Sequence, residues 1–572
     1  MKLFKLAFAI TLILCSSCCF AVNVTTAAGL ATALTTSPAG TTVTLGDNID
    51  CTGWTTVDSF SGTLDGQGYK ITNLDAPLLG TITGDIAISN LVVKDANVTA
   101  TAETCGILLK SVTAANLTVE NVTFTGSTLR VSVNNGNMGF VVGLFSVTGT
   151  ASFKDCHVDD TCSFALGVNQ HGGIAGNGTA TGTGATISFT HCTMAAALST
   201  VASYGSQFGG IAGNLSLQGG GRTVADYAHL IMDGCTNYSG NASAWSGSNR
   251  SFGGLVHSSG CGNSTHMGDA VITRCANYGS LIYNGQLTSS GTNYGGLIGN
   301  WSNGKLTMDD CVNFGSVIST HGGDTRSAIA GIVGSITAPI QVEVSITGCA
   351  NRGDITGYYA GGIVGTLTHN KDYGNNRFFI RSCLNTGTIV ARKEGGASGQ
   401  AVGALTSELA YPRIDIEGGI YMTNALIGTC AEGSSVTTLG TADNVFLDNS
   451  DGLVDGTDIA TLNAYNENSN LWKQGHEYPI LKILPDEAVP DTVVATFKDW
   501  DETVLKQKTV ARGWYVIPPG NPVREGSTFL GWDPDVFTEL VADTTFVAQY
   551  ASGSLSYSVS FVDWDGTPLC ED

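Results

Sequence analysis

Two pairs of adjacent aspartates, and two histidines that precede glycine pairs, are the side chains of this sequence that could support hydrolysis. A glycoside hydrolase needs two or three carboxylates that converge on one groove. One aspartate pair directly precedes a repeated cysteine, so we expect it at a turn or an outward strand position, and the histidines flank a glycine box or lie in a loop. We therefore expect none of them to be catalytic. The residues are Asp159, Asp160, Asp309, Asp310, His171 and His321.

A cysteine recurs in the phrase Cys-x-Asn-x-Gly, which alternates with a glycine box such as GGIAG, GGLIG or GGIVG. Two phrases that keep a fixed order between Gly172 and Leu405 indicate a repeat architecture. The boxes begin at Gly172, Gly209, Gly253, Gly295, Ala330, Gly361 and, weakened, Val402. The cysteine phrases begin at Cys235 (a looser copy), Cys275, Cys311, Cys349 and Cys383, and Cys156 and Cys192 hold the same place.

Short segments rich in Val, Ile and Thr, separated by Gly, Asp and Asn, fill residues 40–170 and each later repeat. Such segments are typical of strands joined by tight turns. Residues 295–319 hold three of them, as a β-helix coil of roughly 20–30 residues requires. The sequence therefore predicts an all-β solenoid with one coil in each repeat, and two coils per repeat is the alternative. A short helix at Ala27–Leu34 would cap the open end.

With one coil per repeat, the cysteines stack about 4.8 Å apart with parallel Cβ vectors, which does not suit a disulfide. We expect buried free thiols, and no CxxC pair beyond the N-terminal segment supports a metal site. The asparagines would hydrogen-bond from coil to coil, and the glycine after each would turn the corner. The predicted ladder is Cys235, Cys275, Cys311, Cys349 and Cys383 with Asn237, Asn277, Asn313, Asn351 and Asn385; some of the off-ladder Cys51, Cys105, Cys162, Cys261 and Cys430 could pair.

The N-terminus has the pattern of a secretory signal peptide, residues 1–21, with a basic start, an apolar core and a small-x-small site ending at Ala21. Lipidation of a cysteine in this segment is the alternative. Without the two lysines of the signal, the charge is (26 − 2) − 48 = −24. Such a surface repels nucleic acid, so nucleic-acid binding is excluded. No later stretch is apolar enough to span a membrane.

The segment from Asp448 to Asp458 suggests calcium, but it does not fit an EF-hand, because Gly452 and Leu453 occupy positions 5 and 6. We therefore expect a solvated loop and neither a metal nor a cofactor. The triplet Asn-x-Ser/Thr, an acceptor for N-glycosylation in a eukaryote, also occurs repeatedly. The candidate asparagines are Asn97, Asn116, Asn121, Asn177, Asn214, Asn237, Asn241, Asn249, Asn263 and Asn300, besides Asn23 close to the signal.

The glycine box alternating with CxNxG resembles the GLUG-motif repeats of secreted bacterial and protist surface proteins, which include adhesins and protease-associated β-helices. The phrase SGTLDGQGYKITNL at 61–74 resembles the opening coils of secreted right-handed β-helices. Trp472 followed by Tyr478-Pro-Ile-Leu-Lys482 is similar to the closing phrase of such regions. The motif match covers residues 172–405, whereas residues 40–170 share only its pattern of short strands and turns.

After an acidic, proline-bearing linker at 484–493, residues 494–552 resemble the internalin B-repeat, or Listeria–Bacteroides repeat. The likeness rests on FKDWDETVL at 497–505, PVREG at 522–526, FLGWD at 529–533 and VAQY at 547–550. It implies a small β-rich module of ubiquitin-like (β-grasp) topology that acts as a spacer or in adhesion. In that pattern, Trp500 and Trp532 build the core instead of stacking on sugars. FVDWDGTPL at 561–569 begins a second copy, 557–572, which the chain leaves incomplete.

These patterns predict a parallel β-helix over 22–483, with cap and first coils at 22–170, GLUG-type repeats at 171–405 and a closing segment at 406–483. We expect a monomeric stalk of a secreted or cell-surface adhesin-like protein without catalysis, which binds an extracellular protein or glycan. A β-helix polysaccharide hydrolase or lyase is one alternative, and a purely structural spacer is another.

Overall fold

The computed structural model describes most of the chain between Ala21 and Ser552. The predicted signal peptide up to residue 20 and the predicted second module at 557–572 lie outside it. The described stretches are 21–100, 104–131, 136–166, 169–200, 206–245, 251–261, 266–283, 293–319, 327–369, 377–391, 396–405, 413–421, 425–430, 437–439, 445–446, 456–464, 472–473, 475, 479–482, 484, 492–512, 516, 518–524, 527–536 and 540–552.

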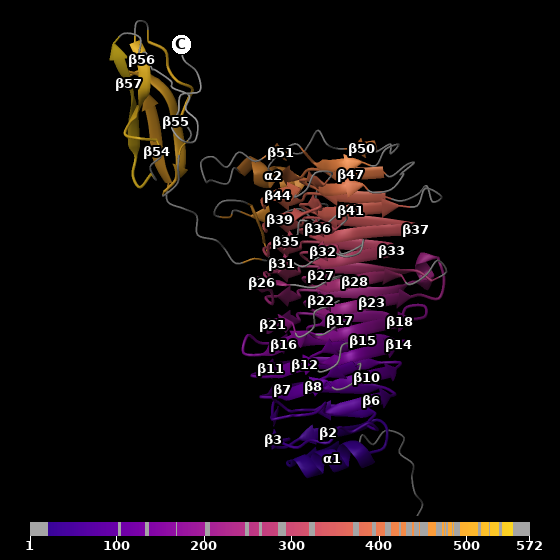
Figure 1. Cartoon of the computed structure of the whole chain (residues 1–572). Coiled ribbons are helices and arrows are strands. Elements are labelled where there is room, and N and C mark those ends of the chain that lie inside the picture. The colour runs from indigo at the N-terminus through magenta and orange to yellow at the C-terminus, as the bar shows by residue number, and fades with distance from the viewer. Residues whose placement is uncertain are drawn as a thin grey trace, which may run out of the picture. The chain divides into compact units, whose positions relative to one another are not determined.

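The chain forms two compact units, the first of which comprises the residues up to Val445 and a short return at Ala464–Glu467. The first unit is a parallel β-helix, because its strands stack coil upon coil and every described strand pair in it is parallel (Figure 1). The fold class expected from the repeats is thereby confirmed. In the repeats, the box glycines pair with one another across neighbouring coils, as Gly253 does with Gly295, and so do the asparagines, as Asn277 does with Asn313. This register gives one coil per repeat.

Each coil contains two long faces. The first face consists of β6 (Leu79–Thr83), β10 (Leu109–Ala114), β14 (Val142–Val147), β18 (Ala175–Thr181), β23 (Ala212–Gln218), β28 (Val256–Cys261), the first parts of β33 (Ile298–Asp309) and β37 (Val333–Thr347), β41 (Val364–His369), β46 (Val402–Leu405) and β49 (Ile427–Cys430). The second face consists of β1 (Ala21–Val24), β2 (Thr41–Leu45), β4 (Gly62–Asp65), β7 (Ile86–Lys94), β11 (Leu117–Thr125), β15 (Thr150–Val158), β19 (Thr186–Thr190), β24 (Ala228–Asp233), β29 (Gly268–Thr273), the second parts of β33 and β37, β42 (Arg377–Arg381), β47 (Arg413–Glu417) and β50 (Thr437–Leu439).

Shorter strands complete each coil. Those that carry the ladder positions are β3 (Ile49–Asp50), β5 (Lys70–Thr72), β20 (Thr193–Met194), β25 (Thr236–Asn237), β30 (Ala276–Asn277), β34 (Val312–Asn313), β38 (Ala350–Asn351), β43 (Leu384–Asn385), β48 (Ile420–Tyr421) and β51 (Val445–Phe446). The next face is β8 (Asn97–Ala100), β12 (Thr128–Val131), β16 (Ser163–Leu166) and β21 (Ala197–Thr200), then β26 (Asn241–Trp245), β31 (Leu281–Tyr283), β35 (Val317–Ser319), β39 (Ile355–Gly357) and β44 (Ile389–Ala391). The box strands are β9 (Thr104–Gly106), β13 (Asn137–Gly139), β17 (Asn169–Gly172), β22 (Ser206–Gly209), β27 (Ser251–Gly253), β32 (Asn293–Gly295), β36 (Ala328–Ala330), β40 (Tyr359–Gly361) and β45 (Ala397–Gly399).

A helix covers the N-terminal end of the stack, as predicted. Helix α1 (Ala27–Thr36) begins after Thr26, whose hydroxyl accepts a hydrogen bond from the Gly29 backbone N–H at 3.1 Å, as N-cap residues do. It buries Leu30 and Leu34 completely against the first coil. The edge of the first coil is therefore not left open for another chain to pair with.

The corner between the second face and the ladder strand is turned by one residue of left-handed backbone conformation. Its φ lies between about 49° and 62° in ten successive coils. The corner predicted at the glycine of Cys-x-Asn-x-Gly is a different one, between the ladder strand and the next face. Gly279 lies there between β30 and β31, and these glycines do not have positive φ. The corner residues, each directly before a ladder position, are Asn90, Asn121, Asp155, His191, Gly234, Arg274, Asp310, Gly348, Ser382 and Gly418.

The recurring glycines are required by close packing. A Cβ atom on Gly315 would lie 2.1 Å from the carbonyl oxygen of Gly279 in the preceding coil. In the five boxes that begin between Gly209 and Gly361, the second glycine meets the ladder asparagine across the coil interior, so that a Cβ on Gly296 would lie 2.3 Å from Cγ of Asn313. Glycine is the residue that permits such an approach. The glycine box and the Cys-x-Asn-x-Gly phrase therefore recur together because their residues pack against each other.

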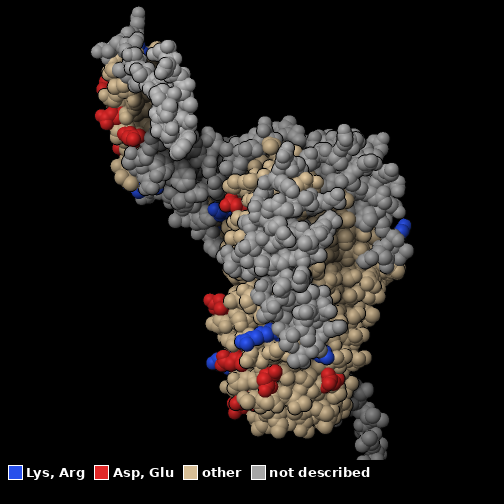
Figure 2. Space-filling model, in the orientation of Figure 1, with Lys and Arg blue, Asp and Glu red and all other residues tan. Residues whose placement is uncertain are grey.

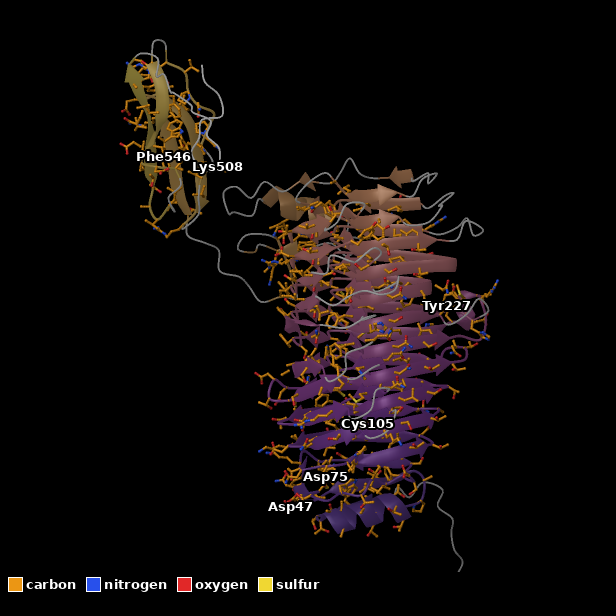
Figure 3. All side chains as sticks on the ribbon, in the orientation of Figure 1. Asp47, Asp75, Cys105, Tyr227, Lys508 and Phe546 are labelled. Carbon is orange, nitrogen blue, oxygen red and sulfur yellow. The ribbon has the colours of Figure 1, made fainter. Side chains whose placement is uncertain are left out.

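The second unit contains α2 (Gly456–Ala464), the antiparallel pair β52 (Trp472–Lys473) and β53 (Ile480–Leu481), and a four-stranded mixed sheet. Asn463 of α2 accepts a hydrogen bond from the Trp472 backbone N–H at 3.0 Å. The sheet order is β55 (Val504–Ala511), β54 (Thr492–Lys498), β57 (Thr544–Ser552) and β56 (Ser527–Asp533), with β54 parallel to β57. Phe497 and the labelled Phe546 stack in its core (Figure 3). The ubiquitin-like topology stays a prediction.

We expect the substitution Gly296→Ala to destabilise the β-helix by about 1–3 kcal/mol or more, because the new methyl group overlaps the Asn313 amide and the Gly331 carbonyl. The melting temperature of the purified variant measures this effect. Thr307→Ala, on the outward side of the same coil, is the matched control and should change stability little. Equal melting temperatures for Gly296→Ala and the wild type would contradict the close contact.

Candidate functional site

Seven cysteines form a single row along the inside of the β-helix. They follow the left-handed corner in successive coils, and all are fully buried free thiols. Six of the thiols lie against a carbonyl group of the preceding coil, as in the contacts from Cys235 to Phe189 and from Cys311 to Ile272, both 3.5 Å, and Cys275 contacts the Thr273 carbonyl of its own coil at 3.2 Å. The row is Cys156, Cys192, Cys235, Cys275, Cys311, Cys349 and Cys383, and it includes the five positions predicted as a thiol ladder.

Burial controls the chemistry of these thiols. It raises the pKa of the Cys383 thiol to about 12, and it likewise raises the pKa of Cys235, Cys275 and Cys349. A thiol that stays protonated is neither a nucleophile nor a metal ligand. No group of three or more metal-ligating side chains occurs in the part of the chain that the structure describes. Cys235, Cys275, Cys349 and Cys383 therefore act as small apolar residues of the core.

The off-ladder cysteines give no disulfide either. Cys51, Cys105, Cys162 and Cys261 are buried free thiols, so the expectation that some of them pair is not met among these four. Burial raises the pKa of Cys51, Cys105 and Cys162 to about 12. The side chain of Cys430 lies outside the described residues.

Beside the thiols runs a chain of buried amides. Nδ2 of Asn237 donates to Oδ1 of Asn277 at 2.7 Å, and the pattern repeats through Asn313, Asn351 and Asn385 at 2.8–2.9 Å. The last amide donates to Oε1 of Gln400 at 2.7 Å. Each Nδ2 also donates to the carbonyl group two residues further along its own strand, as Asn313 does to Gly315 at 2.8 Å. These amides are fully buried and leave no group for a ligand.

The candidate carboxylates do not converge. Asp159 binds its own turn, because its Oδ1 accepts a hydrogen bond from the Thr161 backbone N–H at 3.0 Å, and Asp160 is exposed. The Asp309–Asp310 pair belongs to the coil of β33, four coils further on, or about 19 Å at the spacing of parallel strands. A pair of glycosidase carboxylates lies within about 10 Å. No hydrolase site is formed between these two pairs.

Asp309 and Asp310 nevertheless form the most perturbed acidic pair. Asp309 is half-buried at the end of β33, and Asp310 occupies the left-handed corner, where 6% of it is exposed. Its Oδ1 finds no hydrogen-bond partner among the described residues. Burial raises the pKa of Asp309 to about 6 and that of Asp310 to about 7.

The candidate histidines do not form a common site. His171 is fully buried, with its ring 6.1 Å from that of Phe164, and belongs to the core. His321 lies outside the described residues. His257, from the GGLVH box, is also in the interior, and burial lowers its pKa to about 4. The described histidines of the boxes are therefore packing residues and not proton donors.

One polar pair was missed by sequence reasoning. Nδ1 of His229 on β24 lies 2.6 Å from Oδ1 of Asp269 on β29, on the outward side of the second face. A carboxylate that orients an imidazole is part of many general-base sites. Forty residues separate the pair in sequence, and only the register of the coils brings it together.

Trp500 and Trp532 have different environments. Trp532 is partly buried, 4.9 Å from Phe497 and edge-on to it, so it contributes to the core of the module as predicted. Trp500 is 53% exposed at the tip of the β54–β55 hairpin, and its prediction as a core residue is wrong. The hairpin tip directs this indole away from the core, whose aromatic positions are Phe497 and Phe546.

The glycosylation triplets also divide by exposure. Asn97, Asn116 and Asn121 are exposed, and Asn177, Asn214 and Asn300 are half-buried on the first face. Asn237 has to be removed from the candidates, because its amide is fully buried and hydrogen-bonded within the ladder. The side chain of Asn241, Asn249, Asn263 and most of the segment proposed for calcium, 448–455, lie outside the described residues.

We expect Asn313→Asp to lower stability by about 1–3 kcal/mol or more at neutral pH, because the carboxylate cannot donate to Gly315 or Asn351. Thermal unfolding of the variant measures the loss. Asn300→Asp, on the outward side of the same coil, provides the control. A melting temperature of Asn313→Asp equal to that of Asn300→Asp would show that the amide chain does not stabilise the stack.

Asp310 gives a prediction on pH dependence. A carboxyl group with a raised folded-state pKa holds its proton where the unfolded chain has lost it, so its contribution to stability falls between about pH 4 and pH 7. Asp310→Asn should therefore be increasingly more stable than the wild type as the pH rises from 4 to 8. Melting temperatures across this range test it, with the exposed Asp160→Asn as control. A pH-independent difference for Asp310→Asn would refute it.

No protein-family model matches the chain, and no curated protein matches it. A solved structure that is similar to it is the crystal structure of a "putative immunoglobulin A1 protease" from Bacteroides ovatus. The two chains are 13% identical, the likeness covers 81% of this chain and 92% of the other, and the TM-score is 0.26. No helix in the described part of the chain is long and apolar enough to cross a membrane.

Proposed function

We propose that this chain is a secreted or cell-surface adhesin-like repeat protein without catalytic activity. Its β-helix forms a stalk that displays variable loops and outward faces, and the module after it acts as a spacer. The partner is an extracellular protein or glycan. The likeness to GLUG repeats and to the B-repeat supports this proposal through the residues that carry it, although no family model matches the chain.

One observation carries the proposal. The residues that define the repeat point inward and bind one another: the thiols contact carbonyl groups, the amides contact amides, and the glycines admit both. The repeated residues therefore serve to stack one coil on the next, and none of these repeated contacts involves a catalytic group. Repeat proteins of this kind use the surfaces between their repeated positions for binding.

The first face offers such a surface. In most coils, two outward positions alternate with buried ones, and in register these two ranks of positions run from Thr81 and Thr83 on β6 to Asn300 and Ser302 on β33. In the later coils the first rank, at Ser335 and Thr366, is buried. Neither rank carries a charged residue in any of the described strands, although the chain is strongly acidic. The visible described surface is mostly uncharged, with scattered acidic and basic residues (Figure 2). This flat hydroxyl- and amide-bearing face suits an uncharged partner.

The same two ranks explain several glycosylation triplets. Asn177 with Thr179, Asn214 with Ser216, and Asn300 with Ser302 each consist of an amide in one rank and a hydroxyl in the other. Nδ2 of Asn214 donates to Oδ1 of Asn177 in the neighbouring coil at 3.5 Å. In a strand, every second residue faces outward, so an outward asparagine and an outward hydroxyl residue are spaced as in the triplet Asn-x-Ser/Thr. The triplets on this face are therefore explained by the strand pattern without a role in glycosylation.

Binding of the purified chain to immobilised extracellular-matrix proteins and glycans tests the proposal. We expect saturable binding that is weakened by Thr113→Lys with Thr179→Lys on the first face, because the new charges must lose hydration in the contact. Thr118→Lys with Ser152→Lys, on the second face, is the control pair. Absence of binding to every surface by the folded protein would refute adhesion and leave a structural spacer.

A polysaccharide hydrolase or lyase is the second candidate, favoured by the raised pKa values of Asp309 and Asp310. Perturbed carboxyl groups occur at active sites as well as in structural positions. Incubation with a polysaccharide panel, followed by assay of new reducing ends, decides between the two. Turnover that is lost in Asp309→Asn or Asp160→Asn would overturn the non-catalytic proposal.

A further inference from the structure

The indole of Trp500 is not needed by the fold of its module. The buried core consists of aliphatic and phenyl groups around Phe497 and Phe546, with Trp532 packed against it. Trp500 lies in the turn between β54 and β55, where the Asp499 backbone N–H donates to the Thr503 carbonyl at 2.8 Å. The Trp500 side chain is 53% exposed, so a large apolar ring, called the plate below, remains in contact with water.

This plate is held in place from one side. The guanidinium carbon of Arg524 lies 4.1 Å from the centroid of the Trp500 ring and 5.7 Å from that of Tyr550. The Tyr550 hydroxyl donates to Oδ1 of Asp499 at 2.7 Å, and the same oxygen accepts from the Trp500 backbone N–H at 2.8 Å. Backbone, carboxylate, phenol and guanidinium thus fix the indole before any ligand arrives, which lowers the entropy lost on binding.

The groups around the plate are polar. Asp499 is half-buried beside it, Asp501 and Glu502 are exposed on the same turn, and Arg524 presents guanidinium N–H donors at its covered face. A ligand for such a site needs an apolar face to lie on the indole and hydrogen-bonding groups at its edge. A pyranose ring has both, with its C–H bonds on one face and its hydroxyl groups around the rim. Three carboxylates outnumber the Arg524 guanidinium and the Lys498 ammonium, which pairs with Glu502 at 2.8 Å, and this balance disfavours an anionic sugar.

We propose that Trp500, Arg524 and Asp499 form a binding site for a neutral pyranose unit of a glycan, with the sugar stacked on the open face of the indole. The carboxylate of Asp499 accepts from sugar hydroxyl groups, and Arg524 supports the indole from its covered face. The proposal deepens the adhesin-like function, on which it rests, by giving the partner's chemical class. A protein partner at the same site is the competing outcome, since Trp, Tyr and Arg also dominate protein interfaces.

The test uses the full chain and a panel of neutral gluco-, galacto-, manno- and N-acetylglucosamine oligosaccharides, with oligogalacturonate as the anionic probe. Isothermal titration should show binding of a neutral oligosaccharide, and Trp500→Ala should raise its Kd at least tenfold. Trp500→Phe should lose less, because a smaller aromatic plate remains. Val541→Ala, another exposed apolar position of the module, is the matched control and should leave Kd unchanged.

Circular dichroism and the melting temperature show whether each variant is folded, and the exposure of Trp500 predicts that they are. Absence of binding to every neutral probe would overturn the glycan site, as would equal affinity in Trp500→Ala, or a loss in this variant of protein binding alone. Adhesion of the wild-type chain to immobilised surfaces is measured in parallel. Adhesion that persists without oligosaccharide binding would refute this site and leave the proposed function standing.

Discussion

The spacing between parallel strands controls everything inside this β-helix. Because one coil lies about 4.8 Å above the next in register, each side chain is packed against the residue that holds its own position in the neighbouring coils. A buried polar residue must therefore be able to donate to and accept from a copy of itself. The carboxamide of Asn313 can do both, whereas a carboxylate or an ammonium group would meet a like charge. The row that contains Asn313 is therefore built from carboxamides.

A second constraint acts across each coil. The box strand and the ladder strand approach so closely that the Asn313 amide occupies the place of a side chain at Gly296. The coil is thin at this point because the buried amide leaves room for backbone only. The thiol row beside it has the same cause, since a cysteine is small and its S–H group can contact a carbonyl of the preceding coil. Glycine, cysteine and asparagine thus recur together for one geometric reason.

Sequence reasoning found those features that repeat. The repeat period predicted the coils, and the spacing of Cys311 and Asn313 placed them next to each other inside the coil, where Cys311 directly precedes β34 and Asn313 ends it. It could not find the corner, because the left-handed position is occupied by Asn, Asp, His, Gly, Arg or Ser in different coils, and six residue types leave no pattern. It also missed the pairing of His229 with Asp269, which depends on register, and it placed Trp500 in the core because a motif does not tell which tryptophan faces outward.

The in-register stack has an evolutionary consequence. Since Gly253 pairs with Gly295 as Gly295 pairs with Ala330, a coil inserted or removed as a whole would find the neighbours that it needs on both sides. Duplication of one gene segment could therefore lengthen or shorten this protein without redesign of its interior. The steps of 31 to 44 residues between boxes show that the units need not even be equal in size. The length of the β-helix, set by its number of coils, could therefore change in evolution to match the distance that the protein has to bridge.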